Sequence, residues 1–136
     1  MSRALAIDYG TVRTGLAVTD SLCMIANPLT TVDTKELWPF LEQYINKENV
    51  TTVIVGYPTH LNGELADIVP LINELITRLQ QHFPSIVVEK HDERFTSKIA
   101  YQAIVTGGLK KKKRADKGLI DRISATIMLE EWLENK

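Results

Sequence analysis

The spacing of apolar residues changes near residue 34, and this change limits how the chain can fold more than any other feature. Before that point, short apolar runs at residues 3–8 and 14–19 flank a glycine-bearing turn, and a third run at 29–32 follows a proline. Short runs separated by turn residues are typical of strands joined by hairpins. We therefore expect these three segments to form an antiparallel meander.

Beyond residue 34, helical spacing alternates with short apolar runs of the kind found in buried strands. Pro70 falls early in one helical segment, which is therefore expected to start or kink near it. The expected elements are a helix over 37–45 with Thr34 as N-cap, a strand over 51–56, a helix over 64–81, a strand over 86–91, a helix over 96–106 and a last helix over 117–134.

This order of elements predicts the fold class. A hairpin meander that feeds βαβ units forms one mixed sheet, here of five strands, with helices on both faces. The chain has 136 residues and no internal repeat or linker, so we expect a single α/β domain over residues 1–136.

Charge and hydropathy limit the kinds of molecule that the protein can bind. The formal net charge is −1, so the overall field of the protein does not attract nucleic acid. No apolar stretch approaches the ~20 residues that cross a membrane, and the single cysteine excludes an internal disulfide. We expect a cytoplasmic protein without a membrane partner. Local positive charge is concentrated in one segment, here called the basic run: Lys110, Lys111, Lys112, Lys113 and Arg114.

Two acids follow predicted strands. Asp8 ends the first strand, although aspartate is depleted in strands, and Glu93 comes just after the strand at 86–91. Open α/β sheets bind their ligands outside the carboxyl ends of strands, so both acids are candidate site residues. Each also has a purely structural explanation, since Asp8 would suit a turn cap and Glu93 would favour the N-terminus of a following helix.

A third acid, Asp121, lies within the last predicted helix. On a helical wheel it projects close to Ala125, Met128 and Trp132, away from the polar stripe of that helix. A carboxylate on an apolar arc is costly unless it is paired or bound to a cation. The alternative to a bound metal is a salt bridge to Arg13, Arg94 or Lys117.

Together the three acids predict a metal site. Oxygen ligands of this kind suit hard cations, so we expect Mg²⁺ or Mn²⁺ and two ions about 4 Å apart, an arrangement that hydrolyses phosphodiesters. Zinc is not expected, because the three histidines are scattered and there is one cysteine.

Four sequence segments carry a family resemblance. Residues 8–17 read D-Y-G-T-V-R-T-G-L-A, 53–58 read V-I-V-G-Y-P with N-G at 62–63, 92–97 read D-E-R-F-T-S, and 117–125 read K-G-L-I-D-R-I-S-A. In this order and spacing the chain resembles the YqgF family, also called RuvX, which is related to the RuvC Holliday-junction resolvases.

The resemblance implies a ribonuclease H-like fold, with three antiparallel strands beside two parallel ones. It implies that Asp8, Glu93 and Asp121 are the catalytic and metal-binding acids. It also implies a nuclease that processes the 5′ end of precursor 16S rRNA, with structured nucleic acid and the assembling small ribosomal subunit as partners. A resolvase acting on branched DNA is the alternative substrate class.

Several basic residues are candidates for binding nucleic acid. Arg13 and Arg94 present planar donors that suit phosphate oxygens, although either could instead pair with a nearby acid. The basic run is the strongest candidate for backbone binding, and its alternative is a solvated loop. Trp38 and Trp132 lie on apolar helical arcs and are expected in the core rather than stacked on bases.

Two further function classes stay open. A phosphotransferase of the actin and sugar-kinase type also opens with an aspartate–glycine hairpin, but it needs two such domains, and this chain has room for one. A non-catalytic nucleic-acid-binding module of the same fold is the other, and the three acids argue against it.

The basic run gives a direct prediction. If its side chains neutralise phosphates, replacing the four lysines with glutamine lowers the slope of log affinity against log salt concentration by about 0.9 for each duplex phosphate that is no longer neutralised. Fluorescence anisotropy with labelled nucleic acid at several salt concentrations measures this slope. An unchanged slope would assign the basic run to a solvated loop.

Overall fold

The computed structural model describes residues 2–58, 63–92 and 117–135, and its sheet confirms the predicted fold class. The strands are β1 (Arg3–Asp8), β2 (Arg13–Thr19), β3 (Ala26–Asp33), β4 (Val50–Tyr57) and β5 (Val87–Asp92). They form one sheet in the order β3-β2-β1-β4-β5, with the β3-β2-β1 meander antiparallel and β4 and β5 parallel to β1.

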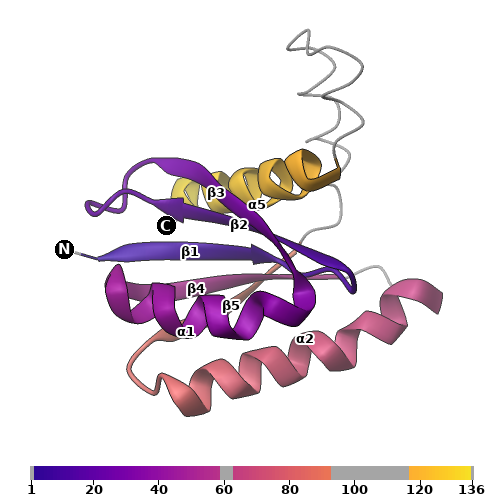
Figure 1. Cartoon of the computed structure of the whole chain (residues 1–136). Coiled ribbons are helices and arrows are strands. Elements are labelled where there is room, and N and C mark those ends of the chain that lie inside the picture. Colours follow the sequence, from indigo (N-terminus) through magenta and orange to yellow (C-terminus); the bar gives the residue numbers. More distant parts are fainter. Residues whose placement is uncertain (1, 59–62, 93–116, 136) are drawn as a thin grey trace, which may run out of the picture.

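Helices cover both faces of this sheet, as Figure 1 shows. A short 3₁₀ turn (Thr34–Glu36) leads into α1 (Leu37–Lys47), which lies with α2 (Gly63–His82) on one face. The last helix, α5 (Lys117–Glu134), lies on the other face and has the bounds that its spacing predicted. No helix in the described part of the chain is long and apolar enough to span a membrane.

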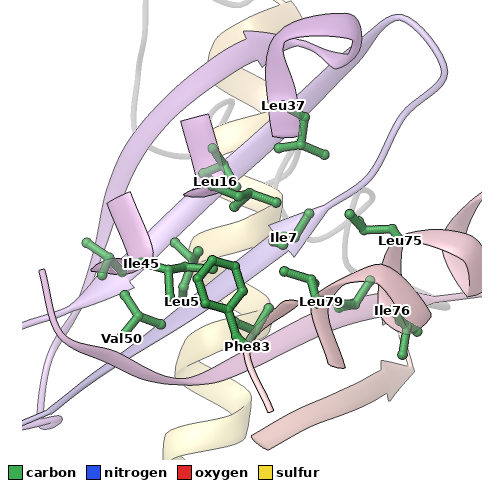
Figure 2. Close-up of a cluster of buried hydrophobic side chains, with 14 of the residues drawn as sticks. Leu5, Ile7, Leu16, Leu37, Ile45, Val50, Leu75, Ile76, Leu79 and Phe83 are labelled. Atoms are coloured by element: carbon green, nitrogen blue, oxygen red, sulfur yellow. The ribbon is translucent and has the colours of Figure 1, made fainter. Parts of the chain in front are cut away.

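The two faces of the sheet differ in the size of their side chains. Along β1, Leu5 and Ile7 contribute to a cluster of large residues under α1 and α2, shown in Figure 2. The intervening Ala4 and Ala6 join Ala17 in a cluster under α5. Successive strand residues point to opposite faces, so one strand supplies both clusters. Because the α5 side has small residues, α5 can approach the sheet closely.

Strand β3 is longer than predicted. It starts at Ala26 rather than Leu29 and includes Pro28, which has no amide hydrogen for a sheet hydrogen bond. The strand tolerates proline because it lies at an edge of the sheet, and because its pairing with β2 shifts register at this point. The proline was therefore a poor marker of where the strand begins.

One prediction about a helix start is wrong. Thr34 is not an N-cap: its hydroxyl donates to the Gly10 carbonyl (2.6 Å) and pairs with the Thr14 hydroxyl (2.9 Å), which ties the end of β3 to the β1–β2 turn. Helix α2 has nearly the predicted bounds of 64–81, and of the two alternatives at Pro70 a start near it is excluded, because the proline lies inside the helix. The helix predicted over 96–106 lies outside the described residues.

Candidate active site

Asp8 is the last residue of the central strand β1 and is half-buried. The alternation that places Ala4 and Ala6 under α5 continues to Asp8, so its side chain belongs to the same face. In the antiparallel pairing of β1 with β2, Asp8 lies opposite Gly15. The residues packed around Gly15 are therefore also neighbours of Asp8.

Gly15 is the point at which α5 touches the sheet. A Cβ atom built on this glycine would overlap the backbone carbonyl of Asp121 and lie 2.9 Å from the Asp121 Cβ. Only a residue without a side chain allows this approach. Residues opposite each other in an antiparallel pair have Cα atoms about 4.5–5.5 Å apart, so the backbone of Asp8 lies close to Gly15, the residue on which Asp121 packs. Gly15 thus neighbours two of the three predicted acids, Asp8 through strand pairing and Asp121 through the packing of α5.

Arg13 completes this group of charges. Its Nε donates to Oδ2 of Asp121 at 3.1 Å, and the two side chains are 36% and 24% exposed. Arg13 lies two residues before Gly15 on β2, so the strand alternation carries it to the face that α5 covers. The salt-bridge alternative is confirmed for Asp121, and a contact between Arg13 and phosphate stays a prediction.

The third predicted acid follows β5 in the sequence. The strands β1, β4 and β5 are parallel, with Ile7 beside Val55 and Tyr57 beside Asp92, so their carboxyl ends share one edge of the sheet. Two strand spacings of about 4.8 Å separate β1 from β5. Glu93 itself lies outside the described residues, as do Arg94 and the basic run. The described residues contain no group of three possible metal ligands.

Sequence reasoning missed the contacts that assemble this site. Gly15 read as one small strand residue among several, although its pairing with Asp8 and its contact with Asp121 make it central. Ser124, one helical turn beyond Asp121, is 1% exposed, and its hydroxyl has no hydrogen-bond partner among the described residues.

Comparison with known proteins decides the family. The family model described as "RuvX: Holliday junction resolvase" matches residues 2–135. The chain belongs to the RuvX family. A protein of Christiangramia forsetii named "Putative pre-16S rRNA nuclease" is 53% identical over 133 residues, which cover 98% of each chain. One of the same name from Phocaeicola vulgatus is 52% identical over 140 residues, covering 100% of this chain and 98% of the relative.

A solved structure confirms the fold. T. thermophilus RuvC, in complex with a Holliday junction substrate, matches 99% of this chain and 96% of its own with a TM-score of 0.61. The sequences are 18% identical, so this likeness concerns the fold alone. The resemblance to RuvX and the RuvC-like fold were thus both predicted correctly. RuvX is a family of nucleases, and the predicted class of enzyme is confirmed at that level.

The contact at Gly15 predicts a destabilised variant. Gly15→Ala forces α5 away from β2, so we expect a loss of roughly 1–3 kcal/mol in the free energy of unfolding. Urea denaturation followed by circular dichroism measures this loss. Val87→Ala, at a 55% exposed strand position, is the control and should change stability by less than about 0.5 kcal/mol. A Gly15→Ala protein as stable as the wild type would contradict the close contact.

The ion pair predicts a small coupling energy. Both Arg13 and Asp121 are partly exposed, and solvent weakens such pairs. A double-mutant cycle of Arg13→Gln and Asp121→Asn, measured by denaturation in a metal chelator, should give a coupling below about 1 kcal/mol. A value above roughly 2 kcal/mol would mean that the pair is a main support of the fold.

Proposed function

We propose that this chain is a metal-dependent endonuclease that processes the 5′ end of precursor 16S rRNA. The observation that carries the proposal is that Gly15, at the carboxyl end of the central strand, pairs with Asp8 and is packed against Asp121. Ligands of open α/β sheets bind at this end of the strands. We further propose that the protein acts in the cytoplasm, on the assembling small ribosomal subunit.

The residues present fit a hard divalent cation. Asp8 and Asp121 offer carboxylate oxygens, the donors that Mg²⁺ and Mn²⁺ prefer, and neither is fully enclosed. Asp8, Asp121 and Glu93 would hold the ion or ions. When bound, such ions activate water and stabilise the leaving oxygen of a phosphodiester.

Arg13 has two parts in this proposal. Its Nε donates to Asp121 and so fixes the orientation of that carboxylate. A guanidinium has further donors in the same plane, which suit the oxygens of a phosphate. Arg13 would therefore position Asp121 while it contacts the substrate backbone. Arg94 and the basic run are proposed to supply additional phosphate contacts.

The choice of RNA is supported by two relatives, which are named for pre-16S rRNA and match this chain over nearly its full length. A branched DNA substrate is the second candidate, because the family is described as Holliday junction resolvase. These substrates differ in the 2′-hydroxyl and in shape, so one panel of substrates separates them.

The decisive experiment is a cleavage assay. Labelled RNA spanning the 5′ precursor region of 16S rRNA is incubated with Mg²⁺ or Mn²⁺, beside a DNA copy and a four-way DNA junction. We expect metal-dependent RNA cleavage. Cleavage of the junction alone would move the assignment to a resolvase, and metal binding without cleavage of any substrate would favour a binding module.

Substitution of the acids tests the site. Asp8→Asn and Asp121→Asn should each lower the cleavage rate by more than roughly 100-fold, beyond the usual cost of losing a residue that only supports a metal ligand. Each should also weaken Mn²⁺ binding measured by calorimetry. Asp67→Asn, at an exposed position of α2, is the matched control and should change neither quantity. An Asp8→Asn protein with full activity would refute the site.

A further inference from the structure

A cavity of about 200 Å³ lies on the other face of the sheet, between the carboxyl end of β1 and the helices α1 and α2. Its walls include Tyr9, Thr34, Trp38, Leu71, Glu74 and Arg78. Leu71, Glu74 and Arg78 are exposed and Trp38 is half-buried, so solutes can reach the walls. None of these residues belongs to the proposed metal site.

The cavity adjoins that site through the backbone. Tyr9 directly follows Asp8, and neighbouring Cα atoms are about 3.8 Å apart. Asp8 faces α5, whereas Tyr9 packs against the cluster of large residues under α1 and α2. Thr34, which lines the cavity, also bonds to the Gly10 carbonyl in the turn that leads to Arg13. A nucleic acid crossing this edge of the sheet would therefore contact both the proposed metal site and the cavity.

The aromatic wall of the cavity has the chemistry of a stacking site. Trp38 packs against the core, yet the Arg78 guanidinium lies 4.0 Å from the centre of its ring. The His82 ring meets Trp38 edge-on, at a centroid distance of 5.4 Å and an angle of 82°. Indole rings and guanidinium planes are the surfaces on which unpaired bases stack. Trp38 packs against the core, as expected from the sequence, and is also part of the cavity wall.

The wall of the cavity carries one charge of each sign, from Glu74 and Arg78, and can therefore contact both the donors and the acceptors of a base. Glu74 contributes a carboxylate to the wall. A carboxylate repels a phosphate but accepts hydrogen bonds from the amino and imino groups of a base. Arg78, one turn along α2, offers donors to base carbonyls.

Size narrows the ligand further. A volume near 200 Å³ is several times that of one water, which is about 30 Å³ in the liquid, and is below the roughly 300–1,000 Å³ of pockets for drug-sized ligands. A single planar ring system fits this range.

We propose that this cavity binds one unpaired nucleobase of the substrate, next to the phosphodiester held at Asp8 and Asp121. This inference rests on the proposed nuclease function and adds to it a requirement for an unpaired nucleotide beside the cleaved bond. The Arg78 guanidinium, which lies over the Trp38 ring, provides the stacking surface, and Glu74 and Tyr9 provide polar contacts to the edge of the base.

The two tryptophans of the chain provide a direct test by nuclear magnetic resonance. The indole N–H signal of Trp38 reports on the cavity, and that of Trp132, which donates to Glu89 on the other face, is the internal reference. The protein is titrated in EDTA with adenosine, with uridine, with a ten-nucleotide single-stranded RNA and with inorganic phosphate. We expect the Trp38 signal to shift with the RNA and with at least one nucleoside, but not with phosphate, while the Trp132 signal stays in place. A Trp38 signal unmoved by the RNA, or moved equally by phosphate, would overturn the base site.

Variants extend the test to affinity. Trp38→Leu should weaken binding of the single-stranded RNA roughly 5- to 150-fold, the range for loss of one stacked base. Phe40→Leu is the matched control, because Phe40 lies on the same helix, stacks on Tyr44 and does not line the cavity. Equal affinities of the Trp38→Leu and Phe40→Leu proteins would overturn the proposal. If Trp38→Leu fails to fold, the titration of the wild-type protein still tests whether the cavity binds a base.

The base site and the nuclease function fail in different ways. Metal-dependent cleavage by a wild-type protein whose Trp38 signal does not respond to RNA would refute the base site and leave the nuclease in place. A Trp38 signal that responds to RNA, in a protein that cleaves no substrate, would support base binding and refute the nuclease.

Discussion

The contact between the backbone of α5 and Gly15 is the constraint on which the candidate site depends. A helix usually rests on a sheet through side chains, but here the carbonyl of Asp121 occupies the space of a missing Cβ. Because Gly15 pairs with Asp8, this one contact determines the spacing of two acids that are more than a hundred residues apart in the sequence. The alanines under α5 follow from the same requirement, since larger residues would lift the helix away.

The two faces of the sheet divide the work of folding and function. Large residues under α1 and α2 form the larger of the two buried apolar clusters, and burial of apolar surface is the main source of stability. The α5 face has smaller apolar residues and buries less apolar surface. It also holds polar groups close to the sheet: Asp121, Arg13 and the buried hydroxyl of Ser124. The fold can accommodate polar groups on the α5 face because the apolar cluster under α1 and α2 already stabilises the sheet.

Periodicity predicted the sheet, its class and the limits of α5, because burial on alternating faces leaves a strong local pattern in strands and helices. Periodicity did not predict the role of residues whose contacts are with residues far away in the sequence. Thr34 suits an N-cap, yet it bonds to the β1–β2 turn, and Pro28 suits a strand boundary, yet an edge strand accepts it. The pairing of Asp121 with Arg13 was one of several alternatives, since only the fold decides which cation is within reach. The resemblance named all three acids, and the structure describes the places of Asp8 and Asp121.

The end of β1 also links the proposed chemistry to the proposed recognition of a base. Asp8 and Tyr9 are consecutive, and the pleat of the strand sends them to opposite faces of one edge. The Thr34 hydroxyl bonds to the carbonyl of Gly10 in the turn after Tyr9, and Thr34 also lines the cavity. This residue therefore connects the turn to the cavity wall. A substrate with a phosphate at Asp8 and a base beside Tyr9 must wrap around this edge. A regular duplex keeps its bases stacked inside and cannot do so, whereas an unpaired nucleotide can turn its base outward. This geometry therefore favours junctions between paired and single-stranded segments over continuous duplex.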